Sequence, residues 1–560
     1  ESIVDSERHN LRASFLAGIL HGLGRKVLLI QHGESPVAAD YREEIEIVRN
    51  PDQIVEIIED FARQSILATQ TISRSSKSLK RKGIAKLTLG ASAAENEFRR
   101  LEDYFLETAE FNQTIRGDGK IVAGRKGSGK TAIFFRARDI FRNDSRNIVI
   151  DLKPESHELI KLRELLSEYK NLGIVSHTFT GFWQVIFLHE ILLKVKSDLE
   201  YKSRRDHTAL GEIIEIDKTI GDIISSPRGD FTERLNYFVN SMLHKLESSA
   251  KEYGGKIPPE KITNFVYDNN MRLMYDLSKK HLKKYNCAVL FFDNIDKGWP
   301  ATGIHQNDIL IVRCLIDAAN KIQREYAHAD IDFRFSVFLR NDVYELLVEN
   351  TSDRGKDAQI KIDWSDPEKL KLLIGRRLSD ALNTDDSVKQ IWDTYFPKSV
   401  EGEDGFDYAI RHSLMRPRFL IDILERSISI AVNRGKQVVE IEDLREAILQ
   451  HSRYLVNDFG YEIRDVSGIT YEILDAFLGS RKILSADEVR NRLSSYVEPE
   501  IIDDAIKHLV WYGFLGFMKD GNEKYIYDYN YIMRRMHSEI NRAGSKTDYV
   551  INPAFYIGLQ

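Results

Sequence analysis

The chain has 560 residues, of which 42% are hydrophobic and 30% are charged, and this balance predicts a globular protein of roughly three or four domains. The formal net charge of −6 excludes a protein-wide basic field, so any contact with nucleic acid or an anionic membrane would have to be local. Cys287 and Cys314 are the only cysteines, which excludes a disulfide scaffold and a four-cysteine zinc site and is typical of the reducing cytoplasm.

The most apolar stretch, residues 182–195, is interrupted by Gln184, His189, Glu190 and Lys194. A membrane-spanning helix needs about 18 or more apolar residues without such interruptions. We therefore predict no membrane span, no signal peptide and a cytoplasmic location.

Residues 1–70 read as a partial Rossmann-like unit, with NLRASFLAGILHGLGRKVLLI predicting an amphipathic helix and then a buried strand at Val27–Ile30. The segment resembles the TIR and nucleoside-deoxyribosyltransferase superfamily, but the glutamate nucleophile of that family aligns with Leu16. We interpret the unit as a non-catalytic remnant or a docking module; the alternative is a plain structural helix–strand unit. Because so few elements cannot bury a core, we expect residues to precede Glu1.

Residues 71–93 read as a basic linker, since SRSSKSLKRKGIAK holds six Lys or Arg, four Ser and no acidic residue. Such a run is either solvated or a local nucleic-acid contact. Helical spacing returns from Ala94 and leads towards the next strand.

The stretch Lys120–Arg136, KIVAGRKGSGKTAIFFR, predicts a short apolar strand, a glycine loop and a helix, and it matches G-x-x-x-x-G-K-[ST]. Glycines let the backbone N–H groups curl around phosphate oxygens, Lys130 is predicted to reach the β- and γ-phosphates, and Thr131 is predicted to ligate Mg²⁺. The alternative is an ordinary glycine turn. The predicted nucleotide-binding residues in this loop are Gly124, Arg125, Lys126, Gly127, Ser128, Gly129, Lys130 and Thr131. Upstream, Phe111 is placed either to stack on the base or to pack in the core.

A second strand is predicted at residues 147–154, followed by a helical insertion at 155–285. The next strand, Ala288–Phe292, is continuously apolar, as a strand buried on both faces should be. Asp293 follows it at the edge where α/β sheets bind ligands, and we predict that it is the Walker B carboxylate that holds Mg²⁺.

Asn294 stands where many P-loop ATPases carry a glutamate that activates water. An amide can orient water but cannot accept its proton, so slow hydrolysis is predicted. Asp296 either substitutes as the catalytic carboxylate or caps the turn before Gly298.

The strand predicted at 331–342 carries Arg340, Asn341 and Asp342 at its exit, where a sensor would contact the γ-phosphate. Arg354 is either a finger that reaches a neighbouring subunit's nucleotide or a solvated loop residue. Arg416 and Arg418 flank Pro417 at a helix start, and a guanidinium is poorly placed there unless it contacts a phosphate.

The ordered motifs GRKGSGKT, FFDNIDKGW, VFLRND and MRPRFLIDIL resemble the AAA+/STAND side of the P-loop ATPases, similar to the origin-recognition-like and KAP-like groups. The resemblance covers residues 94–455 and the tail. It implies an ATP-dependent switch with a core, a helical lid and a C-terminal winged helix, and relatives often act in anti-phage defence. The chain departs from typical AAA+ proteins at Asn294.

In the tail, helices are predicted at Ile469–Leu478, from Ser485 with Glu488 as a capping box, and from Pro499; the KDGN sequence at 519–522 predicts a hairpin. Three helices and a wing form a winged helix. Its third helix offers Glu500, Asp503 and Asp504 against Lys507, which favours partner docking or autoinhibition over DNA readout.

The predicted fold class is α/β: a P-loop NTPase parallel sheet with a large helical insertion, a helical lid, a C-terminal winged helix and a partial Rossmann-like N-terminal unit. The predicted domains are the TIR-like fragment 1–70, linker 71–93, ATPase core 94–365, lid 366–460 and winged helix 461–560.

The predicted function is an ATP-binding, slowly hydrolysing AAA+/STAND-type switch that assembles or docks a partner, in bacterial anti-phage defence by resemblance. The alternatives are a DNA-associated remodelling or replication-type ATPase and an ATPase that controls an N-terminal glycosidase-like effector. The expected cofactors are ATP and Mg²⁺. A homo-oligomer through the core and a protein partner at the winged helix or N-terminal unit are expected, with nucleic acid not favoured.

Overall fold

The computed structural model describes residues 12–20, 27–32, 45–48, 83–92, 101–154, 172–203, 209–221, 230–252, 271–295, 306–349, 358–544 and 547–560, together with single positions and pairs between them. The chain divides into two compact units. One comprises Glu1–Lys82 and Asp198–Ile213, and the other comprises Gly83–Ser197 and Ile214–Gln560.

The first unit contains a helix at residues 12–20 and two short parallel strands, β1 (Leu29–His32) and β2 (Ile45–Val48). The strand expected at Val27–Ile30 therefore begins slightly later in the chain. In the helix Ala17 is buried, whereas Phe15 and Leu16 are 70% and 58% exposed.

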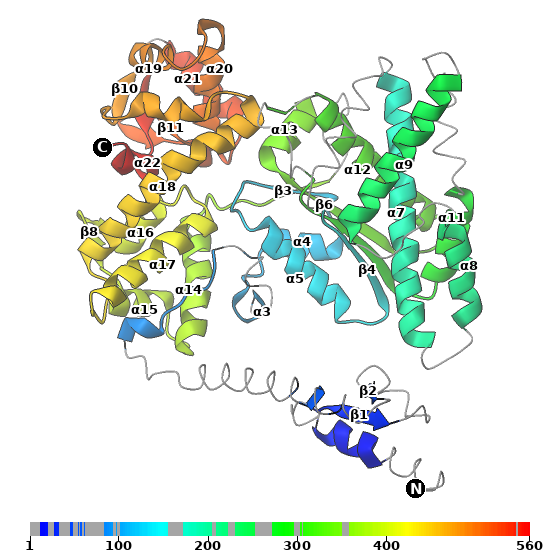
Figure 1. Ribbon diagram of the computed structural model, residues 1–560. Helices are drawn as coiled ribbons and strands as arrows, with labels where there is room; N and C mark the ends of the chain where they lie inside the picture. Colours follow the sequence, from blue (N-terminus) through cyan, green and yellow to red (C-terminus); the bar gives the residue numbers. More distant parts are fainter. Residues whose placement is uncertain are drawn as a thin grey trace. The chain divides into compact units, whose positions relative to one another are not determined.

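The centre of the second unit is a five-stranded parallel sheet in the order β4-β5-β6-β3-β7 (Figure 1). Its strands are β3 (Ile121–Gly124), β4 (Asn147–Leu152), β5 (Cys287–Phe292), β6 (Phe333–Arg340) and β7 (Gln359–Lys361). Because all five run in the same direction, the ends of β3, β5 and β6 meet at one edge of the sheet. The parallel α/β sheet that the sequence predicts is confirmed.

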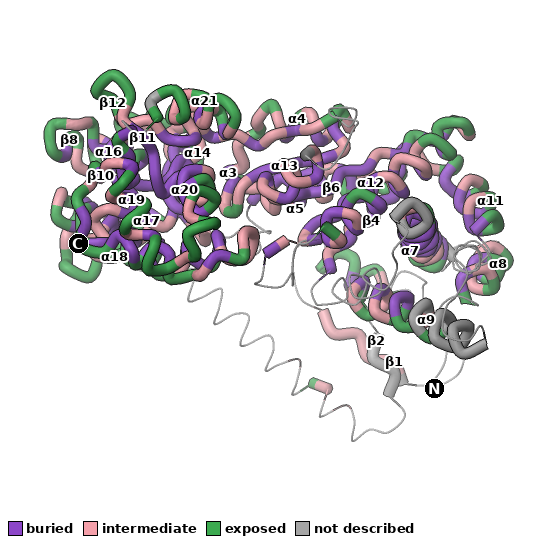
Figure 2. The backbone as a smooth tube through the Cα atoms, turned by 90° about the horizontal axis from the view of Figure 1, so that it is seen from above, coloured by how far each residue is buried: buried purple, intermediate pink, exposed green. Residues whose placement is uncertain are grey.

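Helices cover both faces of the sheet, as alternate side chains of β5 show. Phe291 packs against Phe134 of α5 (Lys130–Arg142), with 6.0 Å between ring centroids, and Phe292 packs against Trp183 of α7 (Leu172–Ser203) at 5.8 Å. Residues 178–192 of α7 are all buried, and Figure 2 shows this helix in purple. The region expected as an insertion therefore forms a layer of the core.

Three more helices occupy the region expected as the insertion: α8 (Leu210–Gly221), α9 (Phe231–Glu252) and α11 (Met271–Leu282). None of the helices in the described part of the chain combines the length and apolar character that crossing a lipid bilayer requires.

Residues 367–467 are mainly helical, with α14 (Pro367–Leu382), α15 (Val388–Tyr395), α16 (Gly405–Arg411), α17 (Pro417–Asn433) and α18 (Ile441–Ser467). A short antiparallel pair, β8 (Ser399–Val400) and β9 (Glu403–Asp404), lies between α15 and α16. Asp366 caps α14 by accepting a hydrogen bond from the Glu368 N–H. The domain boundary expected after residue 460 falls inside α18.

Residues 83–89 differ from the expected solvated linker. Ile84, Leu87 and Leu89 are buried, and the Ile84 N–H donates to the Gln437 carbonyl at 3.1 Å. Apolar side chains in the second half of this basic run explain the correction, because burying them stabilises the segment more than solvating it.

The C-terminal domain, which we define as residues 469–560, combines helices α19 (Ala486–Leu493), α20 (Ile502–Trp511) and α21 (Met533–Ala543) with an antiparallel sheet. The sheet has the order β10-β13-β11-β12, with β10 (Ile483–Ser485), β11 (Leu515–Lys519), β12 (Asn522–Lys524) and β13 (Asp548–Ile551).

The predicted Ser485–Glu488 capping box and the hairpin between β11 and β12 are confirmed. The helix expected at Ile469–Leu478 is a 3-10 helix at Tyr471–Phe477. Neither α21 nor β13 was predicted, although β13 holds the sheet together by pairing with both β10 and β11.

Candidate nucleotide-binding site

The loop between β3 and α5 has the backbone conformation that a phosphate cradle requires. Gly127 and Gly129 have φ angles of 79° and 92°, in the left-handed region that favours glycine. A Cβ on Gly127 would also approach the Arg418 Cβ to 3.1 Å. Trp364 Nε1 donates to the Ser128 carbonyl at 2.8 Å and so fixes the loop. The N–H groups at the start of α5 can therefore bind an anion.

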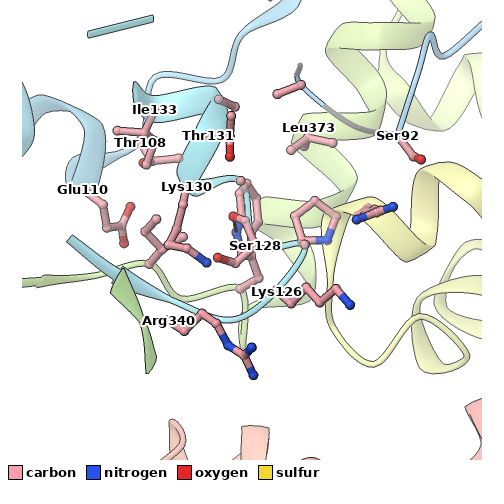
Figure 3. Close-up of a pocket in the computed structure, with 18 of the residues that line it drawn as sticks. Ser92, Thr108, Glu110, Lys126, Ser128, Lys130, Thr131, Ile133, Arg340 and Leu373 are labelled. Atoms are coloured by element: carbon pink, nitrogen blue, oxygen red, sulfur yellow. Dashed lines mark hydrogen bonds between the residues drawn. The ribbon is translucent and has the colours of Figure 1, made fainter. Parts of the chain in front are cut away.

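A cavity of about 470 Å³ lies over this loop, a size typical of small-molecule sites. Figure 3 shows that Lys130 and Thr131 project into it from the start of α5. The other predicted site residues that line the cavity are Lys126, Gly127, Ser128, Gly129, Asp293, Asn294, Arg340 and Arg418.

The polar groups of this cavity fit a nucleotide phosphate with Mg²⁺. Lys130 Nζ donates to the carbonyls of Gly124 at 2.8 Å and Arg125 at 3.1 Å, and it can turn these donors to phosphate oxygens. Ser128 Oγ is buried and has no hydrogen-bond partner among the described residues. Mg²⁺ prefers oxygen ligands such as Thr131 and Asp293 together with substrate phosphates.

Asp293 directly follows β5 and is only 2% exposed. Because Leu152 of β4 pairs with Phe292, the next residue, Lys153, lies beside Asp293, with Nζ 3.8 Å from Oδ2. Our sequence reasoning missed Lys153; its place directly after the neighbouring strand could have indicated it.

Asn294 has a φ of 63°, a left-handed conformation that asparagine adopts more readily than most residues. Its side chain is therefore presented from a tight turn at the cavity wall. Asp296 and Arg354, the other candidate catalytic residues, lie outside the described residues.

Apolar and aromatic side chains also line the cavity, among them Tyr104, Phe105, Leu373 and Ile421. Phe111 does not take part, because it is 1% exposed and packs in the core against Phe105 at 4.7 Å. The core alternative for Phe111 is thus correct, and the aromatic rings that line the cavity include Tyr104, Phe105 and Trp364.

Two predicted phosphate ligands, Arg125 and Arg416, point elsewhere, and we correct their assignment. Arg125 bonds the Trp511 carbonyl in the C-terminal domain and stacks over the Tyr531 ring at 4.1 Å. Burial lowers the pKa of Arg125 to about 10, so it stays charged at neutral pH.

Arg416 is 1% exposed and lies 3.3 Å from the Glu462 carboxylate. Burial alone would raise the pKa of Glu462, but the charges of Arg416, Lys126 and Arg340 outweigh it and lower the pKa. This carboxylate on α18, rather than a phosphate, is the counter-charge that the buried guanidinium needs. Arg416 and Glu462 are far apart in the sequence, so no local sequence pattern indicates this ion pair.

A parallel sheet with a glycine loop between a strand and a helix, and an acidic residue after a neighbouring strand, defines the P-loop NTPase fold class. Among protein families, the model of the FunZ-associated C-terminal helical domain matches residues 368–460. The chain is also 23% identical over 397 residues to the transposon gamma-delta 80.3 kDa protein of Escherichia coli K12. This match covers 69% of this chain and 53% of that protein. The chain thus spans about half the length of this relative.

A second relative, Allergen Alt a 2 of Alternaria alternata, is 22% identical over 25% of this chain and 75% of its own length. Among solved structures, the Aeropyrum pernix ORC1 protein in complex with DNA has a TM-score of 0.31 at 12% identity and covers 83% of this chain and 91% of its own. The Thermotoga maritima RuvB Holliday junction branch migration motor has a TM-score of 0.28 at 10% identity, covering 77% and 92%.

Proposed function

We propose that this chain is an ATP-binding, slowly hydrolysing switch of the AAA+/STAND type, with Mg²⁺ as the metal cofactor. The observation that supports this most directly is the convergence of Lys130, Thr131 and Asp293 on one cavity that apolar and aromatic side chains also line. Asn294 in place of a carboxylate supports slow turnover. The catalytic set we assign is Asp293, Asn294 and Arg340, with Asp296 and Arg354 as further candidates.

Nucleotide titration of Lys130→Ala tests this function. A charge-assisted contact contributes about 1.5–3 kcal/mol, so binding of ATP with Mg²⁺ should weaken roughly 10- to 150-fold. Arg142→Ala is a matched control, because Arg142 lies at the other end of α5 and pairs with Asp151. Equal affinity in wild type and Lys130→Ala would refute the nucleotide site.

We propose further that the switch assembles as a homo-oligomer through its core and docks a protein partner, with bacterial anti-phage defence as its setting and the cytoplasm as its location. The apolar side chains of Phe15, Leu16, Ile19 and Leu20 support docking at the first unit, since they are all at least 40% exposed. Leu16 supplies no carboxylate, which argues against a glycosidase effector there. Mass photometry with and without ATP tests the assembly.

A DNA-associated ATPase is the second candidate, with the C-terminal domain as a winged helix. Arg534 and Arg535 of α21 favour it, because they are exposed and have no ion-pair partner among the described residues. In α20, by contrast, Lys507 pairs with Asp504 at 2.6 Å and Asp503 pairs with Arg490 at 2.9 Å. A salt-dependent DNA titration separates the candidates, since DNA binding that falls with salt and with Arg535→Ala would favour this one.

A further inference from the structure

Arg340 belongs to the nucleotide cavity and to a buried charge cluster at the same time. It ends β6 and lines the cavity. Its Nε and Nη2 donate to Asp342 Oδ1 and Oδ2 at 3.2 and 2.7 Å, so both carboxylate oxygens hold the guanidinium. In Figure 3 the guanidinium points away from Lys130. The sensor arginine is therefore turned out of the phosphate cradle.

Asp342 also contacts the C-terminal domain. The Tyr512 hydroxyl, just after α20, donates to Asp342 Oδ2 at 2.8 Å. The Asp342 side chain is 10% exposed. Burial alone would raise the pKa of Asp342, but the charge of Arg340 outweighs it and lowers the pKa, so the group is a carboxylate at neutral pH.

Neighbouring groups leave this cluster incompletely satisfied. The Asn341 side chain is 3% exposed and, like Arg416 Nε, has no hydrogen-bond partner among the described residues. Buried polar groups without partners cost free energy, which favours a rearrangement that gives them partners. A cavity of about 10 Å³, with room for about one water, lies among Arg125, Lys126, Arg340, Asn341, Asp342, Arg416, Glu462 and Trp511.

We propose that Asp342 is a positioning residue that sets the discrimination between ATP and ADP by holding Arg340 off the terminal phosphate. The proposal rests on the nucleotide function proposed above. ATP offers Arg340 a phosphate that can replace the carboxylate, whereas ADP lacks this terminal phosphate. ATP binding must therefore break the Arg340–Asp342 pair, and ADP binding leaves it intact.

Movement of the Arg340 guanidinium from Asp342 to the terminal phosphate also couples ATP binding to the contact between the core and the C-terminal domain. It leaves Asp342 buried with the Tyr512 hydroxyl but without its counter-charge, which is a costly state. Separation of Tyr512 from Asp342 lets water reach the carboxylate and relieves that cost. ATP therefore loosens the contact of α20 with the core, and ADP does not, because the arginine stays in place.

Calorimetric titration of the full chain with a non-hydrolysable ATP analogue and with ADP, both with Mg²⁺, tests the discrimination. Asp342→Asn keeps the side-chain shape but removes the charge, so the ratio of ATP-analogue to ADP affinity should rise roughly 5- to 150-fold, the range of site couplings. The ADP affinity should stay unchanged. Adding Arg340→Ala to Asp342→Asn should abolish the gain.

Asp332→Asn is the matched control. Asp332 holds Arg334 at the other end of β6 through the same pair of atoms, with distances of 3.1 and 2.7 Å. This variant should leave the ratio unchanged. A ratio that does not respond to Asp342→Asn, or affinities for both nucleotides that shift by the same factor, would overturn the proposal.

Hydrogen exchange of the wild type gives a second measurement that does not depend on the folding of any variant. The ATP analogue should speed amide exchange in Ile502–Lys519, and ADP should not; equal exchange with both nucleotides overturns the coupling. If Lys130→Ala binds nucleotide as the wild type does, the proposed function fails and this proposal falls with it. If binding needs Lys130 but ignores Asp342, only the present proposal fails.

Discussion

At the scale of residues, the proposed ATP hydrolysis depends on which side chains lie beside Asp293. Lys153 neutralises part of its charge at 3.8 Å, and Asn294 follows it in a left-handed conformation. Neither neighbour can take a proton from water at neutral pH, because one is a cation and the other an amide. These two residues explain why slow turnover is expected.

Asn294→Glu should raise basal hydrolysis, since a general base contributes typically about 10²–10⁴-fold. A glutamate in the left-handed region should also destabilise the fold by about 1–2 kcal/mol. Asn294→Gly, which relieves the backbone without adding a base, is the control in ATPase assays and thermal melts. Brisk wild-type turnover that Asp296→Ala abolishes, with no effect of Asn294→Glu, would identify Asp296 as the catalytic carboxylate.

Asp293→Asn should weaken the Mg²⁺-dependent part of nucleotide binding while circular dichroism stays unchanged, because it removes one charge at a strand end. Lys153→Met removes the competing cation and should lower the Mg²⁺ concentration needed for binding. Titration of Mg²⁺ at fixed nucleotide measures both. Wild-type Mg²⁺ dependence in Asp293→Asn would mean that the Walker B residue lies elsewhere.

At the scale of elements, residues 367–467 carry a buried histidine whose ionisation depends on folding. His412 is 3% exposed after α16, with Nδ1 2.8 Å from the Tyr408 carbonyl oxygen. Burial lowers the pKa of His412 to about 4. The folded chain therefore keeps this imidazole neutral at pH values where the unfolded chain protonates it.

The stability of these helices should fall as the pH drops from about 6.5 to about 4, because the unfolded state binds a proton there that the folded state does not. The loss from His412 is at most about 3 kcal/mol. His412→Asn keeps a donor for the Tyr408 carbonyl and cannot titrate, so its stability difference from wild type should shrink towards acid pH. Urea unfolding at several pH values measures this; a constant difference would contradict the assignment.

At the scale of the second unit, the C-terminal domain contacts the loop between β3 and α5 and the residues that follow β6. Arg125 and the Asp342–Tyr512 contact both reach the end of α20, where helix carbonyls favour a cation. The loop that we propose to bind phosphate thus also contacts a domain that is far away in the sequence.

Arg125→Ala should speed hydrogen exchange in residues 502–519 and leave the ADP affinity within about twofold, since the guanidinium does not line the cavity. Lys126→Ala is the contrast, because Lys126 does line the cavity and should weaken binding instead. A loss of ATP affinity in Arg125→Ala equal to that of Lys130→Ala would restore Arg125 as a phosphate ligand.

The sequence by itself determined the elements whose causes are local. A phosphate loop needs glycine at particular backbone angles, a strand buried on both faces needs a continuous apolar run, and a capping box needs Ser485 three residues before Glu488. These patterns predict the sheet, the cradle and much of the C-terminal domain. Only the tertiary structure decided where the long charged side chains go. Arg125 and Arg416 carry the positive charge that a phosphate-binding side chain needs. Their partners in the structure, the Trp511 carbonyl and the Glu462 carboxylate, are distant in sequence. A guanidinium binds whichever acceptor the tertiary fold places beside it, so the local sequence pattern does not predict its partner.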